Sequence, residues 1–337
     1  MKKCSIILLV VLSLFDFEAN SQNLIAIQNG SIQTFQTTLD QAINNATDGD
    51  TIFIPGGIFT ITNPYLNKRI HIFGVGHNPD STIETNPTII NSTIYLQQEA
   101  SSGSLSGVKI SGWINAYGVN LTNYCIHRCY FNGLSLSSSS SNNLFSENII
   151  DGVVSGGGCQ NNFFYNNIIT GGITSFYNNN IFRNNIIKSV PSLACNELWG
   201  FSVSDLTGCI IENNIFNGSI CVWNCIVKNN LLVNSTLAYA QGCIILNNIL
   251  NIDMYNVFIN YSLNNPFNYA YNYHLQSTCP GRNAGTDGTD MGIYGGMFPW
   301  KDGSLPPNPH IQTKIIGQTT DDAGNLNVNI KVAAQDR

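Results

Sequence analysis

A short unit of polar and apolar residues recurs along this chain at a nearly constant interval. The segment 160–169 reads QNNFFYNNII, and the segment 179–187, NNIFRNNII, is a close copy of it. A period near 18 residues, sustained over about 200 residues, is typical of a solenoid. The second Asn of each pair marks the repeat, at Asn148, Asn167, Asn185, Asn214, Asn230 and Asn248. The alignment continues towards the N-terminus through Cys129, Gly112, Thr93, Gly74 and Gly56.

Each repeat is too short for two helices, and its apolar pieces are short and β-branched, with Gly, Asn and Ser between them. This pattern predicts an all-β fold, a parallel β-helix of about eleven coils that stack into a rod on the order of 50 Å long. Asn tolerates the left-handed backbone of a sharp turn, and its amide both donates and accepts hydrogen bonds. The marker asparagines are therefore expected to occupy the turns and to form a ladder from coil to coil.

The segments that flank the repeat region are predicted to terminate the solenoid. Leu39, Ala42, Ile43 and Ala46 fall on one face of a predicted helix that would cover the first coil and shield its strand edges. The alternating runs 311–317 and 326–332, separated by a turn, predict a terminal hairpin. We expect four parts: a signal peptide (1–22), an N-terminal strand and helical cap (23–50), the β-helix (51–300), and a linker with the hairpin (301–337).

The first residues, MKKCSIILLVVLSLF, combine two lysines with roughly a dozen apolar residues, which is typical of a secretory signal and too short for a comfortable membrane span. We therefore expect a secreted or cell-surface protein with no membrane span after cleavage. Charged residues make up 10% of the chain, the net charge is -6 and no basic run occurs. Because phosphate binding needs clustered Lys and Arg, this composition argues against a nucleic-acid partner.

The segment AINNATDGDTIFIPGGIF (42–59) and the closing segment CPGRNAGTDGTDMGIYGG (279–296) resemble the opening and the end of the pectin-lyase-like, right-handed parallel β-helix superfamily. In detail the chain is similar to exported β-helix proteins of Bacteroidetes-type bacteria. The resemblance covers about 34–300 and implies the fold and its right hand. It does not fix an activity, because the superfamily includes polysaccharide lyases, hydrolases, epimerases, tailspikes and non-enzymatic surface proteins.

One column of residues, two positions before each marker, carries the candidate chemistry: His127, Ser146, Tyr165, Arg183, Glu212, Lys228 and Leu246. We expect it to face outward. Arg183, Glu212 and Lys228 would lie on successive coils, and with His127 and Tyr165 they could line a groove for an acidic sugar chain. The alternative is a solvated charge ladder of little energetic value. Between residues 100 and 250 no two acids stand close together in sequence, so the paired-aspartate motif of a polygalacturonase-type hydrolase is not found there.

Three further features are candidates for binding. An insertion between Asn185 and Asn214 contains Trp199 and Phe201, which could stack on a sugar ring or close over the core. Asp287 and Asp290 could hold Ca²⁺, the one cofactor considered, or could make turn hydrogen bonds. Tyr269, Tyr271 and Tyr273 share a strand face that we interpret as a packed edge.

The cysteines are interpreted mainly as core residues. Cys209, Cys225 and Cys243 each lie five positions before a marker, so we expect them to stack in the interior, mostly reduced. Cys125–Cys129 and Cys221–Cys225 are too far apart along a straight strand to bridge. Zinc is not favoured, because only His127 lies beside the first pair and no His lies at ligand spacing beside the second.

The sequence leaves three functions open. The first is an exported structural or glycan-binding surface protein without catalysis. The second is a polysaccharide lyase acting on an acidic glycan, with Lys228 or Arg183 as base and carboxylate neutraliser. The third is a protein-interaction module that uses the terminal hairpin as an edge strand.

Overall fold

The computed structural model describes residues 24–188, 203–218, 220–235, 237–260, 263, 266–306 and 309–334. The predicted signal peptide and two of the candidate sugar-stacking residues, Trp199 and Phe201, lie outside these residues.

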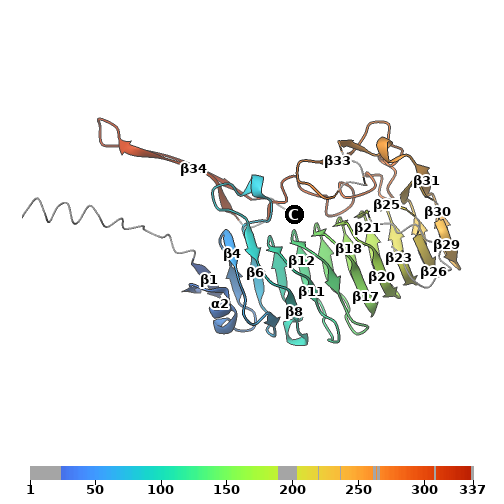
Figure 1. Cartoon of the computed structure of the whole chain (residues 1–337), viewed down its shortest axis with the longest axis horizontal. Helices are drawn as coiled ribbons and strands as arrows, with labels where there is room; N and C mark the ends of the chain where they lie inside the picture. The colour runs from blue at the N-terminus through green and yellow to red at the C-terminus, as the bar shows by residue number, and fades with distance from the viewer. Residues whose placement is uncertain are drawn as a thin grey trace, which may run out of the picture.

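The described chain is a parallel β-helix whose coils each contribute a strand to three sheets, A, B and C, in that order (Figure 1). The predicted fold class is confirmed. Sheet A contains β3 (Thr51–Phe53), β6 (His71–Phe73), β9 (Ser104–Ser106), β12 (Cys125–His127), β15 (Leu144–Ser146), β18 (Phe163–Tyr165), β21 (Ile181–Arg183), β24 (Ile210–Glu212), β27 (Ile226–Lys228) and β30 (Ile244–Leu246).

Sheets B and C complete each coil. Sheet B contains β4 (Gly57–Phe59), β7 (Thr88–Ile90), β10 (Lys109–Ile110), β13 (Tyr130–Phe131), β16 (Ile149–Ile150), β19 (Ile168–Ile169), β22 (Ile186–Ile187), β25 (Ile215–Asn217), β28 (Leu231–Val233) and β31 (Ile249–Ile252). Sheet C contains β5 (Tyr65–Leu66), β8 (Ile94–Leu96), β11 (Ile114–Asn115), β14 (Leu134–Ser135), β17 (Val154–Cys159), β20 (Ile173–Tyr177), β23 (Val203–Thr207), β26 (Ile220–Trp223) and β29 (Leu237–Gln241).

The described rod has ten coils rather than the eleven expected, as the ten strands of sheet B show. The alignment of Thr93 and Gly112 was wrong: both lie between sheets B and C, whereas the other markers lie in the bend between sheets A and B (the A–B bend). The equivalent position in that coil is Val108. A long excursion between Gly74 and β7, which includes the 3₁₀ helix η1 (Pro79–Ser81), makes one coil look like two.

The N-terminal end of the rod, the head, is closed by a cap. Strand β1 (Ile25–Asn29) pairs antiparallel with both β2 (Ile32–Gln36) and β3. Helix α2 (Leu39–Asn45) begins after Thr38, whose hydroxyl accepts from the backbone N–H of Gln41, and its face of Leu39, Ala42 and Ile43 is buried. The predicted helical cap is confirmed.

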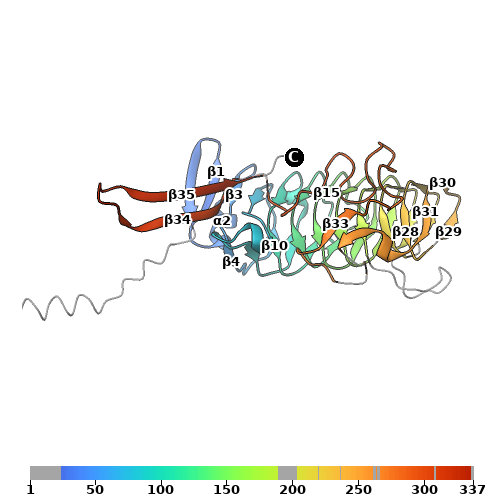
Figure 2. The same ribbon diagram turned by 90° about the horizontal axis from the view of Figure 1, so that it is seen from above.

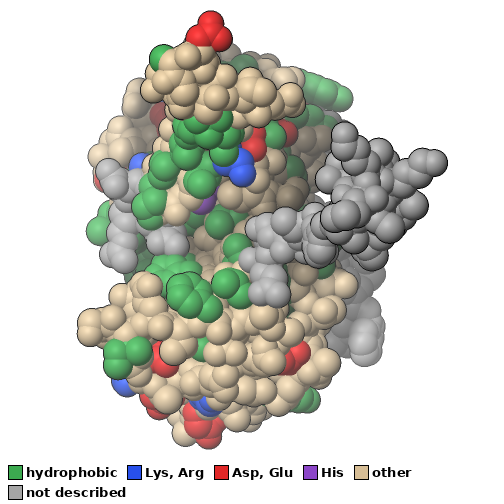
Figure 3. Space-filling model, turned by 90° about the vertical axis from the view of Figure 1, so that its left-hand side faces the viewer, with side chains coloured by type: hydrophobic (Ala, Val, Ile, Leu, Met, Phe, Trp, Pro, Cys, Tyr) green, Lys and Arg blue, Asp and Glu red, His purple; other side chains and the backbone are tan. Residues whose placement is uncertain are grey.

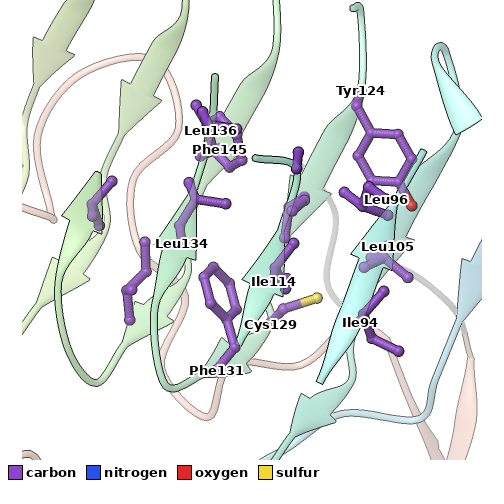
Figure 4. Close-up of a cluster of buried hydrophobic side chains, with 14 of the residues drawn as sticks. Ile94, Leu96, Leu105, Ile114, Tyr124, Cys129, Phe131, Leu134, Leu136 and Phe145 are labelled. Carbon is purple, nitrogen blue, oxygen red and sulfur yellow. The ribbon is translucent and has the colours of Figure 1, made fainter. Parts of the chain in front are cut away.

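The interior is filled by side chains that stack from coil to coil. Phe145, Phe164 and Phe182 lie on consecutive strands of sheet A, with ring centroids 4.6 and 4.9 Å apart. Side chains of all three sheets meet in the interior, among them Leu105 of sheet A, Phe131 of sheet B and Ile114 of sheet C (Figure 4). The 3₁₀ helix η2 (Gln98–Ala100) lies between β8 and β9. Burial of this continuous column is the main stabilising contribution to a solenoid, since each coil covers only its neighbours.

The marker asparagines form a buried ladder in the A–B bend. Each side-chain Nδ2 donates to Oδ1 of the Asn one coil further on, from Asn148 through to Asn248, at 2.9–3.0 Å. The expectation that these residues take the left-handed backbone was wrong. It is the preceding residue that has positive φ, as in Asn166, Asn184, Asn213 and Asn229.

A second ladder, which the sequence reading missed, occupies the bend between sheets C and A. Asn143, Asn162 and Asn180 repeat the same amide pairing. Cys209, Cys225 and Cys243 continue this column, where Sγ of Cys225 accepts from the backbone N–H of Cys209 at 3.3 Å. These three cysteines have free thiols, as do Cys129, Cys159 and Cys279, whereas Cys221 is disulfide-bonded.

After the last coil the chain turns back along the rod. The 3₁₀ helix η3 (Met254–Asn256) leads into an antiparallel pair, β32 (Phe258–Asn260) and β33 (Asn272–Leu275). Residues 281–306, which we call the strap, then run over the A–B bends towards the head. Strands β34 (His310–Thr320) and β35 (Leu326–Ala333) form the predicted terminal hairpin, which projects past the head (Figures 1 and 2). Among the described residues no helix has the length and apolar character to cross a membrane.

Candidate functional site

The strap is held by the left-handed residues of the A–B bends. Asn166 Nδ2 donates to the carbonyls of Ile293 and Gly295, both at 2.7 Å, and Asn184 Nδ2 donates to Gly292 O at 3.2 Å. A Cβ on Gly295 would lie 1.9 Å from the carbonyl of Asp290, so only glycine fits there. Nearer the head, Arg128 Nη1 donates to Leu305 O at 2.7 Å. In four of the pairs the first Asn therefore binds the strap while the second builds the ladder: Asn166, Asn184, Asn213 and Asn229.

Strand register places the candidate column in one row of sheet A. His127, Ser146, Tyr165, Arg183, Glu212 and Lys228 are partners on successive strands. The expectation that the whole column faces solvent was wrong for Ser146 and Glu212, which are each 1% exposed. The side chains of Arg183 and Lys228 are 32% and 34% exposed. The strap covers this row of side chains, and the repeat pattern does not predict the path of the strap.

Glu212 is enclosed by the two cations on its neighbouring coils. Its Oε1 pairs with Arg183 Nη2, and its Oε2 lies 2.8 Å from Lys228 Nζ. A carboxylate is buried at low cost only when paired in this way. Both cations already have an anionic partner, so neither is a ready base or a free neutraliser of a substrate carboxylate.

A second charged cluster lies around His127. Its Nδ1 is 2.9 Å from Ser146 Oγ, and its Nε2 is 3.7 Å from Glu147 Oε1. Arg128 Nε donates to Glu147 Oε2 at 2.8 Å, and both side chains are buried. Burial raises the pKa of Glu147, and the positive charge of Arg128 opposes this increase. This pair was missed by the sequence reading, although both residues occupy the position that Asn fills in later coils.

A pocket of about 210 Å³ opens beside His127, between the outer face of sheet A and Phe298 of the strap. Its lining includes Cys125, Ser106 and Leu144. Phe298 also stacks on Tyr165 at 5.6 Å between ring centroids, and the guanidinium of Arg183 lies 6.0 Å from the same ring. Tyr165 thus packs against the strap rather than presenting an open ring face.

A larger cluster of rings surrounds a second pocket, between the strap and the segment before β33. We call this the aromatic pocket: a volume of about 260 Å³ lined by Tyr271, Asn272, His274, Tyr294, Trp300 and Asp302, among others. The rings of His274 and Tyr294 stack 3.6 Å apart, and Tyr294 Oη donates to Asp302 Oδ1 at 2.8 Å. Burial, followed by the bond to Asp302, raises the pKa of Tyr294, so its phenol stays protonated.

The interpretation of Tyr269, Tyr271 and Tyr273 as a packed edge is correct, and the same residues also line a pocket. Tyr273 is buried, and Tyr269 Oη donates to the carbonyl of His77 at 3.1 Å. Tyr271 is partly buried against the same hydrophobic cluster, and all three tyrosines line the aromatic pocket. The density of rings in FNYAYNYH (267–274) was the available signal, but the strap residues that complete the pocket are distant in sequence.

Asp287 and Asp290 make hydrogen bonds within their own segment. Asp287 Oδ1 accepts from the hydroxyl of Thr289 at 2.6 Å, and Asp290 Oδ1 accepts from the backbone N–H of Asn283 at 2.9 Å. Within the described ranges, no group of three or more His, Cys, Asp or Glu residues is placed to hold a metal ion. The two aspartates thus act as turn-forming residues here.

The candidate site consists of two pockets beside the strap on the β-helix. The buried carboxylates near it form ion pairs with neighbouring basic side chains. No protein-family model matches this chain, and no curated protein matches it, so the functional conclusion depends on the chemistry of these two pockets.

Proposed function

We propose that this chain is an exported surface β-helix that binds a glycan in the aromatic pocket without cleaving it. The observation that carries the proposal is the pocket lining: aromatic rings stand beside one carboxylate, Asp302, and the amide of Asn272. A sugar ring has an apolar face of C–H groups and an edge of hydroxyls. Rings that present an apolar body, with a few placed polar groups, match both features.

The scaffold supports a binding role. The pocket walls come from the strap and from the segment before β33, and both are fixed by packing and hydrogen bonds. Tyr273 is buried beneath the pocket, and Trp300 is 9% exposed. A preformed site loses little side-chain entropy when a ligand binds, so modest contacts can give useful affinity. The secretory signal expected at residues 1–22 would place this surface where polysaccharides occur.

We propose that the protein does not cleave the glycan, because its charged side chains are either paired with one another or too few in the aromatic pocket. Hydrolysis of a glycoside needs two carboxylates across the bond, and among the described residues that line the aromatic pocket Asp302 is the only acidic one. A lyase needs a base beside a group that neutralises the uronate. Arg183 and Lys228 are both engaged by Glu212, and Arg128 is engaged by Glu147.

The test is a binding and cleavage screen of the mature protein against acidic and neutral polysaccharides, with and without Ca²⁺. We expect at least one glycan to bind, and Tyr271→Ala and Asp302→Asn each to weaken binding by about tenfold or more. Tyr117→Ala, at a tyrosine that is 73% exposed outside the pocket, is the matched control and should leave affinity unchanged. No binding across the panel would overturn the proposal. Release of unsaturated products or reducing ends, lost in Lys228→Ala or Arg183→Ala, would establish the lyase instead.

A second candidate function is supported by the terminal hairpin. One of its faces is mainly apolar and exposed: Val328 lies opposite Ile316 and Val332 opposite Ile311. Leu326 and Ile330 share this side, where Ile330 lies opposite Lys314. Seen from the head, hydrophobic side chains gather below the projecting hairpin (Figure 3). An isolated hairpin is at best marginally stable in water, so a protein partner that covers this face or adds a strand would complete it. Truncation after His310 should abolish partner pull-down and surface retention, and unchanged retention would exclude this role.

A further inference from the structure

The end of the rod opposite the head, which we call the tail, leaves the interior of its last coil open. On the last three strands of sheet A, the same interior-facing position is occupied by Ile211, Val227 and Ile245. The first two are fully buried, whereas Ile245 is 45% exposed. Leu250 of β31 is 40% exposed, although Leu232 in the strand beneath is buried. The hydrophobic column that stabilises every other coil therefore ends in solvent.

The three strands of this coil are also edges. Among the described strands β29, β30 and β31 each pair only with the preceding coil, and they lie at the extreme end of the rod (Figure 1). Soluble proteins usually guard such edges with charges, prolines or a covering element. The head follows this rule, because α2 and the antiparallel strands β1 and β2 cover it.

The three strands of the tail carry no charged residue. Residues 229–252 contain no Asp, Glu, Lys or Arg, in a chain of net charge -6. Two copies of an acidic chain repel each other over most approaches, and they repel least where neither carries charge. Residues 152–182 are uncharged as well, but their strands are paired on both sides, whereas the tail combines the lack of charge with open strand edges and exposed interior side chains. A second copy can therefore approach the tail without charge repulsion and cover it.

We propose that the tail binds the tail of a second copy about a two-fold axis, so that β30 pairs antiparallel with its own equivalent. In this arrangement Ile245 lies opposite Ile245 of the partner subunit, and Ile244 lies opposite Leu246 of the partner subunit. The two interior columns then become continuous across the interface. The contact is isologous and the heads are capped, so it closes as a dimer rather than growing into a filament. This inference is independent of glycan binding.

The first test is the mass of the mature full-length chain in solution, measured by light scattering and sedimentation over a range of concentrations. We expect a dimer in the wild type and a monomer in Ile245→Lys, because two buried ammonium groups would face each other. Ile58→Lys is the matched control: Ile58 is 73% exposed on β4 near the head, and its replacement should leave the dimer intact. Circular dichroism and the melting temperature would show whether each variant is folded.

The second test does not depend on disrupting the interface. Ile245→Cys should form a disulfide-linked dimer on mild oxidation, because directly opposed residues of antiparallel strands lie within bridging distance. Ile58→Cys and the wild type, which contains the native thiols, should not cross-link. A wild-type chain that stays monomeric at all concentrations would overturn the proposal. So would a dimer that survives Ile245→Lys, or one that is lost only when the chain is truncated after His310.

Discussion

Asn185 donates a hydrogen bond from its side-chain Nδ2 to Oδ1 of Asn214 at 2.9 Å, across 29 residues of sequence. Elsewhere the ladder joins residues 16 to 19 positions apart, so the insertion leaves its geometry unchanged. Asn185 Nδ2 also donates to Phe164 O at 2.8 Å, and its Oδ1 accepts from the backbone N–H of Asn167. One amide thus satisfies buried groups on three coils, which makes it a structural element rather than a surface residue.

The first prediction concerns this amide. Asn185→Leu should lower the free energy of unfolding by about 3–5 kcal/mol, because several buried donors and acceptors would lose their partners. Asn44→Leu, at an exposed position of α2, should change it by less than about 0.5 kcal/mol. Urea denaturation of both variants measures the difference. Equal effects would mean that the ladder contributes no more than any surface asparagine.

The second prediction concerns the strap. Asn166→Gly keeps a residue that tolerates the left-handed backbone but removes both bonds to Ile293 and Gly295, so we expect a loss of about 1–3 kcal/mol. Hydrogen exchange should increase at the backbone amides of residues 290–300. Asn142→Gly is matched in backbone geometry, since φ is 58° at Asn142 and 54° at Asn166, and Asn142 is exposed in the other bend. Strap exchange that rises equally in both variants would contradict this role.

The sequence was sufficient for features that repeat or that depend on neighbouring residues. The period of the Asn pairs predicted the solenoid, the face of Leu39 and Ile43 predicted the cap, and alternation predicted the hairpin. In each case one local pattern determines one local structure. The second ladder was equally readable, because Asn143 and Asn162 recur at the same offset as the cysteines, five positions before a marker.

The features that were missed depend on contacts between distant segments. The strap residue Phe298 covers Tyr165, and Asp302 meets Tyr294 beside a segment some thirty positions earlier. No period or motif encodes the path of an irregular glycine-rich segment over a rod. For the same reason the burial of Glu212 could not be predicted. Its position in one row with Arg183 and Lys228 was predicted, because that depends only on the repeat.

The third prediction concerns the enclosed carboxylate. Glu212→Gln should destabilise the protein by about 1–3 kcal/mol, because it leaves two cations on alternate coils without their shared anion. The cost stays below that of a fully buried pair, since Arg183 and Lys228 can both reach solvent. Glu84→Gln, at an exposed glutamate, is the control. Thermal unfolding in low and moderate salt would measure both, and a melting temperature equal to the wild type would contradict the prediction.

The fourth prediction concerns His77, a buried histidine whose Nδ1 is 2.9 Å from Tyr269 Oη. Burial, and then the charge of Lys109, lowers its pKa from 6.5 to about 3. Below pH 6.5 the unfolded chain therefore binds a proton at this residue that the folded chain does not. The contribution of His77 to the free energy of unfolding is fully present above pH 6.5. It should be lost as the pH drops towards 3, at up to about 1.4 kcal/mol per pH unit.

His77→Gln removes that titration, so the free energy of unfolding of the variant should depend less steeply on pH between 6 and 4 than that of the wild type. Above pH 7.5 neither state of the wild type is protonated at this residue, and the difference between the two proteins should be constant there. Denaturation curves at half-unit pH steps test both statements. Parallel pH profiles throughout would show that His77 titrates alike in the folded and unfolded chains, and that its burial carries no proton-linked cost.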